Sequence, residues 1–193
     1  MLQASGRLNR KAGGPGFRPP LPRAVTVTLL KNQWPVTKNE AEHYRRSIYL
    51  FARRNLRYPM FEVFDRPDAL ASCARRNTST TAPQSLTLFN SEFSLDRARE
   101  LAGLVLSNAG GPDTQAAITQ SYRRILGRRP TTEELKTGRS FLESQTAALR
   151  KENRQAGQLA SAETATGIDP HFFAAFSDYC LALFNLNEFV YVD

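Results

Sequence analysis

The residues with the clearest chemical potential in this 193-residue chain are arginines of its first half. An arginine guanidinium is a planar fork that grips carboxylate, sulfate or phosphate through two hydrogen bonds, and it also stacks on aromatic rings. The candidate anion-binding residues are Arg45, Arg46, Arg53, Arg54, Arg57, Arg75 and Arg76. Tyr44, Tyr49, Phe51 and Tyr58 are interleaved with them. Such a surface could bind single-stranded nucleic acid, or an acidic or sulfated polysaccharide.

The alternative is that these arginines form ion pairs inside the fold. Carboxylates close in sequence to the Arg53–Arg57 segment are Glu62, Asp65 and Asp68. Arginine is the usual choice for partly buried ion pairs because its fork is rigid and weakly hydrated. We favour this structural role for at least half of the arginines.

The net positive charge of the chain comes from its first eighty residues. Up to Thr80 the chain has fifteen Lys and Arg against five Asp and Glu, which gives a net charge of +10. From Thr81 onward it has eleven against thirteen, which gives −2. A basic half could meet nucleic acid, an acidic glycan, an anionic membrane or an acidic protein surface. Charge asymmetry alone does not define a site, so we favour a solvated face or one that pairs with acidic parts of a larger protein.

The sequence contains no recognisable catalytic motif. Its two histidines, His43 and His171, have no paired carboxylates or cysteines nearby, so no metal set is predicted. No Gly-x-Ser-x-Gly, P-loop or Gly-x-Gly-x-x-Gly string occurs. We therefore expect a chain without catalytic residues and without a cofactor of its own.

The two cysteines, Cys73 and Cys180, are too few for a zinc site and form no Cys-x-x-Cys motif. In an oxidising compartment they could form one disulfide, which would stabilise the fold by about 2–4 kcal/mol. Two buried free thiols are an equal alternative. The N-terminal residues have no apolar core and predict no signal peptide, and no apolar run approaches the ~20 residues of a membrane span.

The elements that would position these residues fall into three regions of one expected domain, 1–193. Residues 1–23 form a Gly/Pro/Arg-rich arm, 24–82 a basic mixed region and 83–193 a helical region. In the mixed region the alternating patterns of 24–30 and 46–52 predict two short strands or extended strips. A helix that starts near Glu40 competes with the second of these predictions.

The second half predicts a mainly α fold with a bundle of about five helices. Their expected ranges are 83–90, 92–108, 114–127, 132–150 and 169–186. Asp113 is expected to cap the third helix, and Thr131 with Glu134 to form a capping box on the fourth. The apolar stripe of the last helix predicts core, and the final NEFVYVD an extended tail.

Several strings support a family resemblance over nearly the whole chain. They include RRSIYLFARRNLRYPMFEVFDRPD, ASCARRNTSTTAPQSLTLFNSEF, YRRILGRRPTTEELK and LALFNLNEFVYVD. The chain resembles the family called domain of unknown function 1553, the planctomycete-type domain. The resemblance implies the C-terminal region of a large exported protein that also carries a planctomycete-type cytochrome c domain. It implies a periplasmic or cell-surface location, with haem only in a partner domain, and it supplies no catalytic residues.

These observations together predict a non-catalytic structural or assembly module, expected to be a fragment of a larger exported multidomain protein. Its partner would be an upstream domain of the same protein or a split partner chain. The first alternative is an anion-binding module for acidic or sulfated polysaccharide. The second is a part of a carbohydrate-related redox enzyme whose active site lies outside this chain. Nucleic acid is not a favoured partner.

Overall fold

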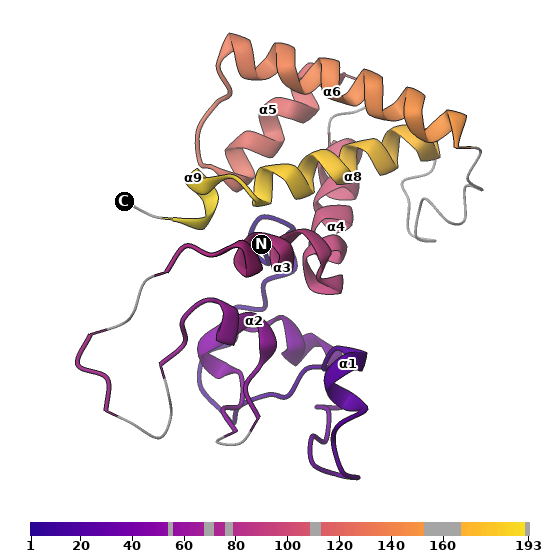
Figure 1. Ribbon diagram of the computed structural model, residues 1–193. Coiled ribbons are helices and arrows are strands. Elements are labelled where there is room, and N and C mark those ends of the chain that lie inside the picture. Colours follow the sequence, from indigo (N-terminus) through magenta and orange to yellow (C-terminus); the bar gives the residue numbers. More distant parts are fainter. Residues whose placement is uncertain (54–55, 68–71, 76–78, 109–112, 153–166, 192–193) are drawn as a thin grey trace. The chain divides into compact units, whose positions relative to one another are not determined.

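The structure is a computed structural model that describes residues 1–53, 56–67, 72–75, 79–108, 113–152 and 167–191 (Figure 1). The described residues are mainly helical, which confirms the predicted fold class. The chain forms two compact units. One consists of Met1–Gly6 with Leu88–Asp193, here called the helical unit, and the other is Arg7–Thr87, here called the basic unit.

The long helices lie where the sequence predicted them. They are α3 (Ala82–Asn90), α4 (Glu92–Asn108), α5 (Thr114–Ile125), α6 (Thr132–Lys151) and α8 (Pro170–Phe184). All five ranges differ from the predictions by at most two residues at either end. The short helix α9 (Asn187–Val190) follows α8. The prediction of an extended tail is therefore wrong for these residues, although Tyr191 after them is extended.

Local capping explains why these helices begin where they do. The Asp113 carboxylate accepts two backbone N–H bonds at the start of α5. Thr131 Oγ1 accepts from the Glu134 backbone N–H at 3.2 Å, and Glu134 Oε2 accepts from the Thr131 N–H at 2.7 Å. This is the predicted capping box, and it satisfies two N–H groups that have no partner within the helix. The Asp169 carboxylate caps α8 by accepting the backbone N–H of His171.

The core of the helical unit is built around α8. This helix packs most extensively against α4 and α6, as its position beside both in Figure 1 illustrates. Its buried apolar side chains confirm the prediction that its stripe is core. They include Phe173, Phe176, Tyr179, Cys180, Leu183 and Phe184. The opening residues of the chain also belong here, since Ala4 is part of the same core cluster.

The basic unit has short helical turns and no sheet among its described residues. Its elements are α1 (Arg23–Thr26), two 3₁₀ turns at Glu40–Tyr44 and Ser47–Tyr49, and α2 (Pro59–Val63). Isolated bridges join Asn9 to Arg45, Phe17 to Leu50 and Arg53 to Leu56. The prediction of little β structure is therefore confirmed.

Both predicted strands of this unit are wrong. Residues 24–30 begin in α1 and continue in turns, and 46–52 form a 3₁₀ turn with one bridge at Leu50. The competing prediction near Glu40 was closer, although the turn there is 3₁₀. A strand needs a paired neighbour to satisfy its backbone groups. The described residues offer none beside 24–30, where Val27 and Leu30 are exposed, so local turn hydrogen bonds replace the ladder.

No helix in the described part of the chain is long and apolar enough to cross a membrane.

Candidate functional site

Arg45, one of the seven candidate anion-binding residues, is enclosed in the basic unit. It is 1% exposed, the largest fully buried side chain among the described residues. Its guanidinium donates to the carbonyl oxygens of Lys11 (3.4 Å), Gly13 and Pro15 (3.0 Å). It also donates to Glu42 Oε2 at 3.0 Å. The guanidinium of Arg45 therefore uses its hydrogen bonds within the chain itself, which supports the structural alternative for this residue.

The neighbouring aromatic rings complete this enclosure. The Arg45 guanidinium lies 4.0 Å from the centre of the Tyr49 ring, and the exposed Arg46 guanidinium lies 5.5 Å from it. Tyr49 Oη accepts from the Gly13 backbone N–H at 2.9 Å. This hydrogen bond, followed by smaller effects of the two arginines, lowers the pKa of Tyr49. The Gly-rich arm is thus held against residues 42–49 by the buried Arg45 guanidinium and the Tyr49 side chain.

A second stack repeats the pattern at the other end of the arm. Arg18 lies 3.9 Å from the centre of the Phe51 ring, and Trp34 packs edge-on to the same ring. Trp34 Nε1 donates to the Pro19 carbonyl at 2.7 Å. Cation–π contacts of this kind contribute about 0.5–2 kcal/mol, depending on how much water is excluded. The interleaving of arginine with aromatic residues is therefore largely an internal network.

Glu42 is the carboxylate on which this network depends, and the sequence analysis did not identify it. It accepts from Lys11 Nζ at 2.7 Å and from Arg45 at 3.0 Å. The Lys11 hydrogen bond is the main cause of the lowered pKa of Glu42. Its i,i+3 spacing from Arg45 was the available signal, and it agrees with the competing prediction of a helix that starts near Glu40.

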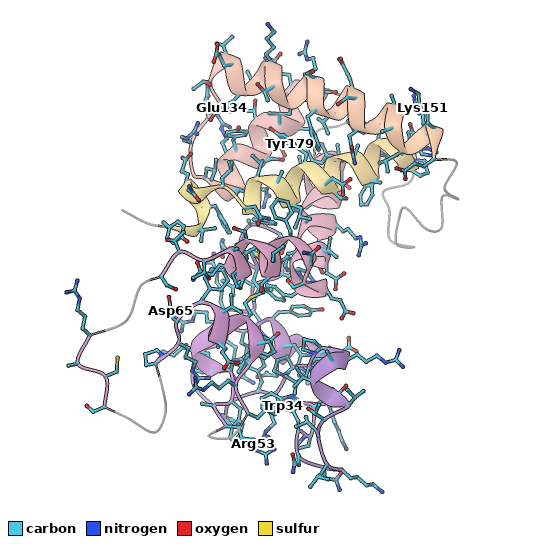
Figure 2. All side chains as sticks on the ribbon, viewed as in Figure 1. Trp34, Arg53, Asp65, Glu134, Lys151 and Tyr179 are labelled. Atoms are coloured by element: carbon cyan, nitrogen blue, oxygen red, sulfur yellow. The ribbon has the colours of Figure 1, made fainter. Side chains whose placement is uncertain are left out.

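The other predicted arginines that the structure describes do not gather into one site. Arg53 donates to the Gln33 carbonyl, and Figure 2 shows Arg53 and Trp34 in the same unit. Arg57 lies 3.9 Å from Glu62, a loose and exposed ion pair that agrees with one expected pairing. Arg46 and Arg75 are exposed. Arg54 and Arg76 lie outside the described residues.

The other expected acidic partners have different roles. Asp65 accepts from the backbone N–H and the hydroxyl of Ser79, at 2.8 and 2.6 Å. Gln84 reaches the same cluster through hydrogen bonds to the carbonyls of Val63 and Ser79, both at 3.1 Å. Asp65 therefore fixes the chain that leads into α3. Asp68 lies outside the described residues.

Both cysteines are free thiols in the structure, Cys73 exposed and Cys180 buried. Burial raises the pKa of Cys180 to about 12, so its thiolate is disfavoured. The disulfide between them stays a prediction. His43, in the basic unit, has Nε2 2.8 Å from the Thr37 carbonyl oxygen, and His171, in the helical unit, lies beside Asp169. Within the described ranges no group of three or more His, Cys, Asp or Glu could hold a metal ion.

An arginine clamp in the helical unit also escaped the sequence analysis. Arg128 donates to both carboxylate oxygens of Glu134, at 2.7 and 2.9 Å, and to both of Glu188, at 2.6 and 2.8 Å. It therefore ties the first turn of α6 to α9. The Arg128 hydrogen bonds lower the pKa of Glu134 to about 2 and also lower that of Glu188. A fully satisfied arginine such as this one is a structural tie.

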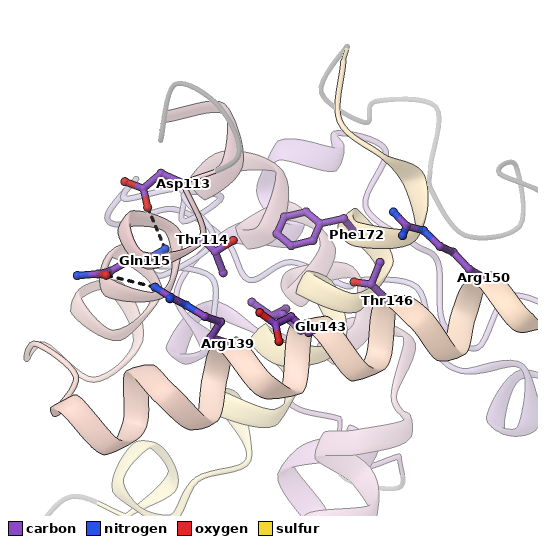
Figure 3. Close-up of a pocket in the computed structure, with 9 residues that line it drawn as sticks. Asp113, Thr114, Gln115, Arg139, Glu143, Thr146, Arg150 and Phe172 are labelled. Carbon is purple, nitrogen blue, oxygen red and sulfur yellow. Dashed lines mark hydrogen bonds between the residues drawn. The ribbon is translucent and has the colours of Figure 1, made fainter.

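A pocket of about 470 Å³ lies on the helical unit, bounded by α6, the start of α5 and the start of α8 (Figure 3). Its volume is within the range of small-molecule sites. Arg139 and Glu143 from α6 and Gln115 from α5 provide polar walls, and Leu142 and Phe172 provide apolar ones. Sequence reasoning could not find it, because its residues come from three separate helices.

Comparison with known proteins relates the chain to one family. A family model described as PSD1, protein of unknown function (DUF1553), matches residues 1–142. The matched range includes the whole basic unit and the helical unit as far as the middle of α6. No curated protein and no solved structure matches the chain.

Proposed function

This chain belongs to the DUF1553 family of proteins of unknown function, and we propose that within this family it is a non-catalytic assembly module. Its basic unit binds a partner polypeptide, and the arginine–aromatic network gives that unit its shape. The partner is an acidic protein surface with apolar side chains. If that partner carries the haem-bearing domain implied by the sequence resemblance, the chain is the non-catalytic part of a redox enzyme.

The distribution of exposed apolar side chains carries this proposal. Eight large apolar residues are exposed in the described part of the chain, and six of them belong to the basic unit. These six are Val27, Leu30, Val36, Ile48, Phe51 and Leu86. Ile48 is 83% exposed, Leu30 74% and Val27 72%. Single exposed apolar residues are ordinary, but six of them on one small unit give it apolar surface that a partner could cover.

The charge of the same unit supports an acidic partner. Residues 7–87 contain fifteen Lys and Arg against five Asp and Glu. Glu42 is already shared by Lys11 and Arg45, so it leaves little negative charge for the other cations. An acidic partner would be steered towards this surface, and the apolar side chains would supply the contact area.

Site-specific photo-crosslinking tests this proposal. A photoreactive benzoylphenylalanine is placed at Ile48, and in a control protein at Lys151, an exposed residue at the end of α6. In cells that make the protein, we expect Ile48 to cross-link to one defined polypeptide and the Lys151 control not to. That polypeptide, once purified, should bind the wild-type chain and bind Leu30→Ser or Val27→Ser variants at least about tenfold more weakly.

A second candidate function is the binding of an acidic or sulfated polysaccharide, favoured by the exposure of Arg46, Arg57 and Arg75. Retention on heparin at low salt that weakens in an Arg46→Gln/Arg57→Gln variant would support it, because exposed charges act through screened electrostatics. If heparin retention is unchanged in this variant and Ile48 cross-links to a defined polypeptide, the results support assembly and not polysaccharide binding. Absence of any defined cross-link at Ile48 would contradict the assembly proposal.

A further inference from the structure

The pocket beside α6 contains two opposite charges that do not pair with each other. Arg139 and Glu143 are one helical turn apart, a spacing that commonly gives an ion pair. Here Arg139 is turned away and donates to Gln115 Oε1 at 3.3 Å, as the dashed line in Figure 3 shows. Glu143 has no ion-pair partner among the residues that the structure describes. One cation and one anion therefore remain available at the same wall.

The other charges that line the pocket are already committed. The Asp113 carboxylate caps α5 by accepting the backbone N–H groups of Gln115 and Ala116. Arg150 is paired with Asp169, with 2.5 Å between Nη2 and Oδ2. The pocket thus offers a ligand one unneutralised guanidinium and one unneutralised carboxylate.

The apolar walls lie next to this charge pair. Leu142 is buried at the base, and Phe172 is held at the edge by a tilted contact with Phe176, with ring centres 6.2 Å apart. Thr146 is 7% exposed, and its hydroxyl oxygen has no hydrogen-bond partner among the described residues. In Figure 3 this hydroxyl is directed towards the space between Phe172 and Glu143. A buried polar group without a partner is uncommon in folded proteins. Because this oxygen is itself buried, the ligand contacts come from the charged and apolar residues of the pocket.

From these features we infer that the pocket binds a free α-amino acid with a large apolar side chain. The carboxylate of the amino acid binds Arg139, which can hold it with two parallel hydrogen bonds. Its ammonium group binds Glu143, and its side chain packs on Leu142 and Phe172. The ammonium and carboxylate of an amino acid are fixed on one carbon, which suits two opposite charges one helical turn apart. A pocket of about 470 Å³ has room for an aromatic side chain.

This inference goes beyond the assembly role, since the pocket and the exposed apolar side chains of the basic unit are separate features. It gives the helical unit a ligand-binding function. The two proposals therefore stand or fall on different experiments.

Calorimetric titration of the full chain with L-phenylalanine tests the inference. We expect a Kd of about 1 mM or tighter. Phenylalaninamide lacks the carboxylate and N-acetylphenylalanine lacks the ammonium, so each should bind at least about tenfold more weakly. L-Alanine should also bind at least about tenfold more weakly, because it cannot reach the apolar walls.

Matched variants assign each charge to its partner. Arg139→Gln should weaken phenylalanine about tenfold or more and leave phenylalaninamide binding unchanged. Glu143→Gln should weaken phenylalanine to a similar degree and leave N-acetylphenylalanine binding unchanged. The controls are Lys136→Gln and Glu133→Gln, which make the same charge changes on α6 outside this pocket and should leave the Kd unaltered.

Three outcomes would overturn the inference. The first is the absence of binding heat for phenylalanine up to about 10 mM, a limit set by the weakest affinity of interest. The second is equal affinity for phenylalanine, phenylalaninamide and N-acetylphenylalanine. That result would indicate an apolar pocket that does not recognise the charges of the ligand. The third is equal weakening by the Lys136 and Arg139 variants. Circular dichroism of each variant, expected to match the wild type, excludes unfolding as the cause.

Discussion

Replacing Arg45 by methionine tests whether the arginine–aromatic network stabilises the basic unit. Methionine keeps most of the side-chain length and volume but removes the charge and every N–H donor. The carbonyl oxygens of Lys11, Gly13 and Pro15 would then lose their guanidinium donor, and Glu42 would lose its buried partner. The substitution therefore removes the guanidinium donor but leaves its carbonyl and carboxylate acceptors in place.

The expected cost is large because the Arg45 side chain is buried. Glu42 is partly exposed and keeps Lys11 as a partner, so most of the cost comes from the carbonyl oxygens. Each carbonyl left without a donor would cost about 1–3 kcal/mol if it stayed buried, but relaxation of the Gly-rich arm towards water relieves part of this penalty. We therefore expect Arg45→Met to lower the free energy of unfolding of the basic unit by about 3–5 kcal/mol. Arg45→Lys should recover only part of the lost free energy of unfolding, because an ammonium group cannot make the hydrogen bonds of the planar guanidinium.

Urea unfolding with two probes measures this effect. Trp34 is the only tryptophan of the chain, and it belongs to the basic unit, so its fluorescence reports on that unit. Far-UV circular dichroism reports mainly on the long helices of the helical unit. Arg46→Met is the matched control, because Arg46 is the exposed neighbour, and it should change the free energy by less than about 0.5 kcal/mol. Equal fluorescence midpoints for the Arg45 and Arg46 variants would refute the structural role of Arg45.

Thiol labelling, acid titration and a glycine substitution test three other features. One thiol per native chain, Cys73, should react quickly with a disulfide reagent and Cys180 only after unfolding, whereas a disulfide between them would leave none reactive. Because the pKa of Glu134 is lowered to about 2, its stabilising contribution should be complete above about pH 4.5 and decline as the pH falls towards 2; Glu134→Gln should remove this part of the acid dependence of the urea midpoint. Gly138→Ala should destabilise by about 1–3 kcal/mol in the same assay, because its Cβ would lie 2.7 Å from Tyr179 Oη in a closely packed core.

The acid titration and the glycine substitution each have a control in the chain. Glu133→Gln alters an exposed carboxylate of the same helix turn and should leave the acid dependence unchanged. Gly103→Ala adds a Cβ that meets only Phe173 at 3.8 Å, so the gain in helix propensity should raise stability by up to about 1 kcal/mol. If both glycine variants changed stability in the same direction, close packing at Gly138 would not be the cause. If the urea midpoint depended on pH equally in the Glu133→Gln and Glu134→Gln variants, the result would argue against the Arg128–Glu134 ion pair as its cause.

The five long helices could be predicted from sequence because the signals that define them are local. A capping residue acts on N–H groups two or three residues away, as Asp113 does in α5 and Thr131 in α6. The apolar stripe of α8 has a helical period that any core would bury. The arginine-rich composition of the first half likewise indicated internal pairing, since arginine accompanied by aromatic rings suits partly buried contacts.

The candidate sites depended on contacts that sequence spacing does not encode. Arg45 and Arg46 are adjacent and chemically identical, yet one is buried and the other exposed. The difference is set by carbonyl groups about thirty residues away, at Gly13 and Pro15. The amino-acid pocket is a similar case, because Arg139 and Phe172 line one cavity only after α6 and α8 pack together.

The sequence alone therefore determined the helix positions, their caps and the concentration of positive charge in the first half, because each depends on residue types within a few positions of one another. The tertiary structure decided that residues 24–30 turn instead of pairing, that Glu42 with backbone carbonyls encloses Arg45, and that the charges of Arg139 and Glu143 remain unpaired beside an aromatic wall. These outcomes depend on which distant groups fill the hydrogen-bonding capacity of a side chain or a backbone. Only the folded arrangement of the chain supplies those partners.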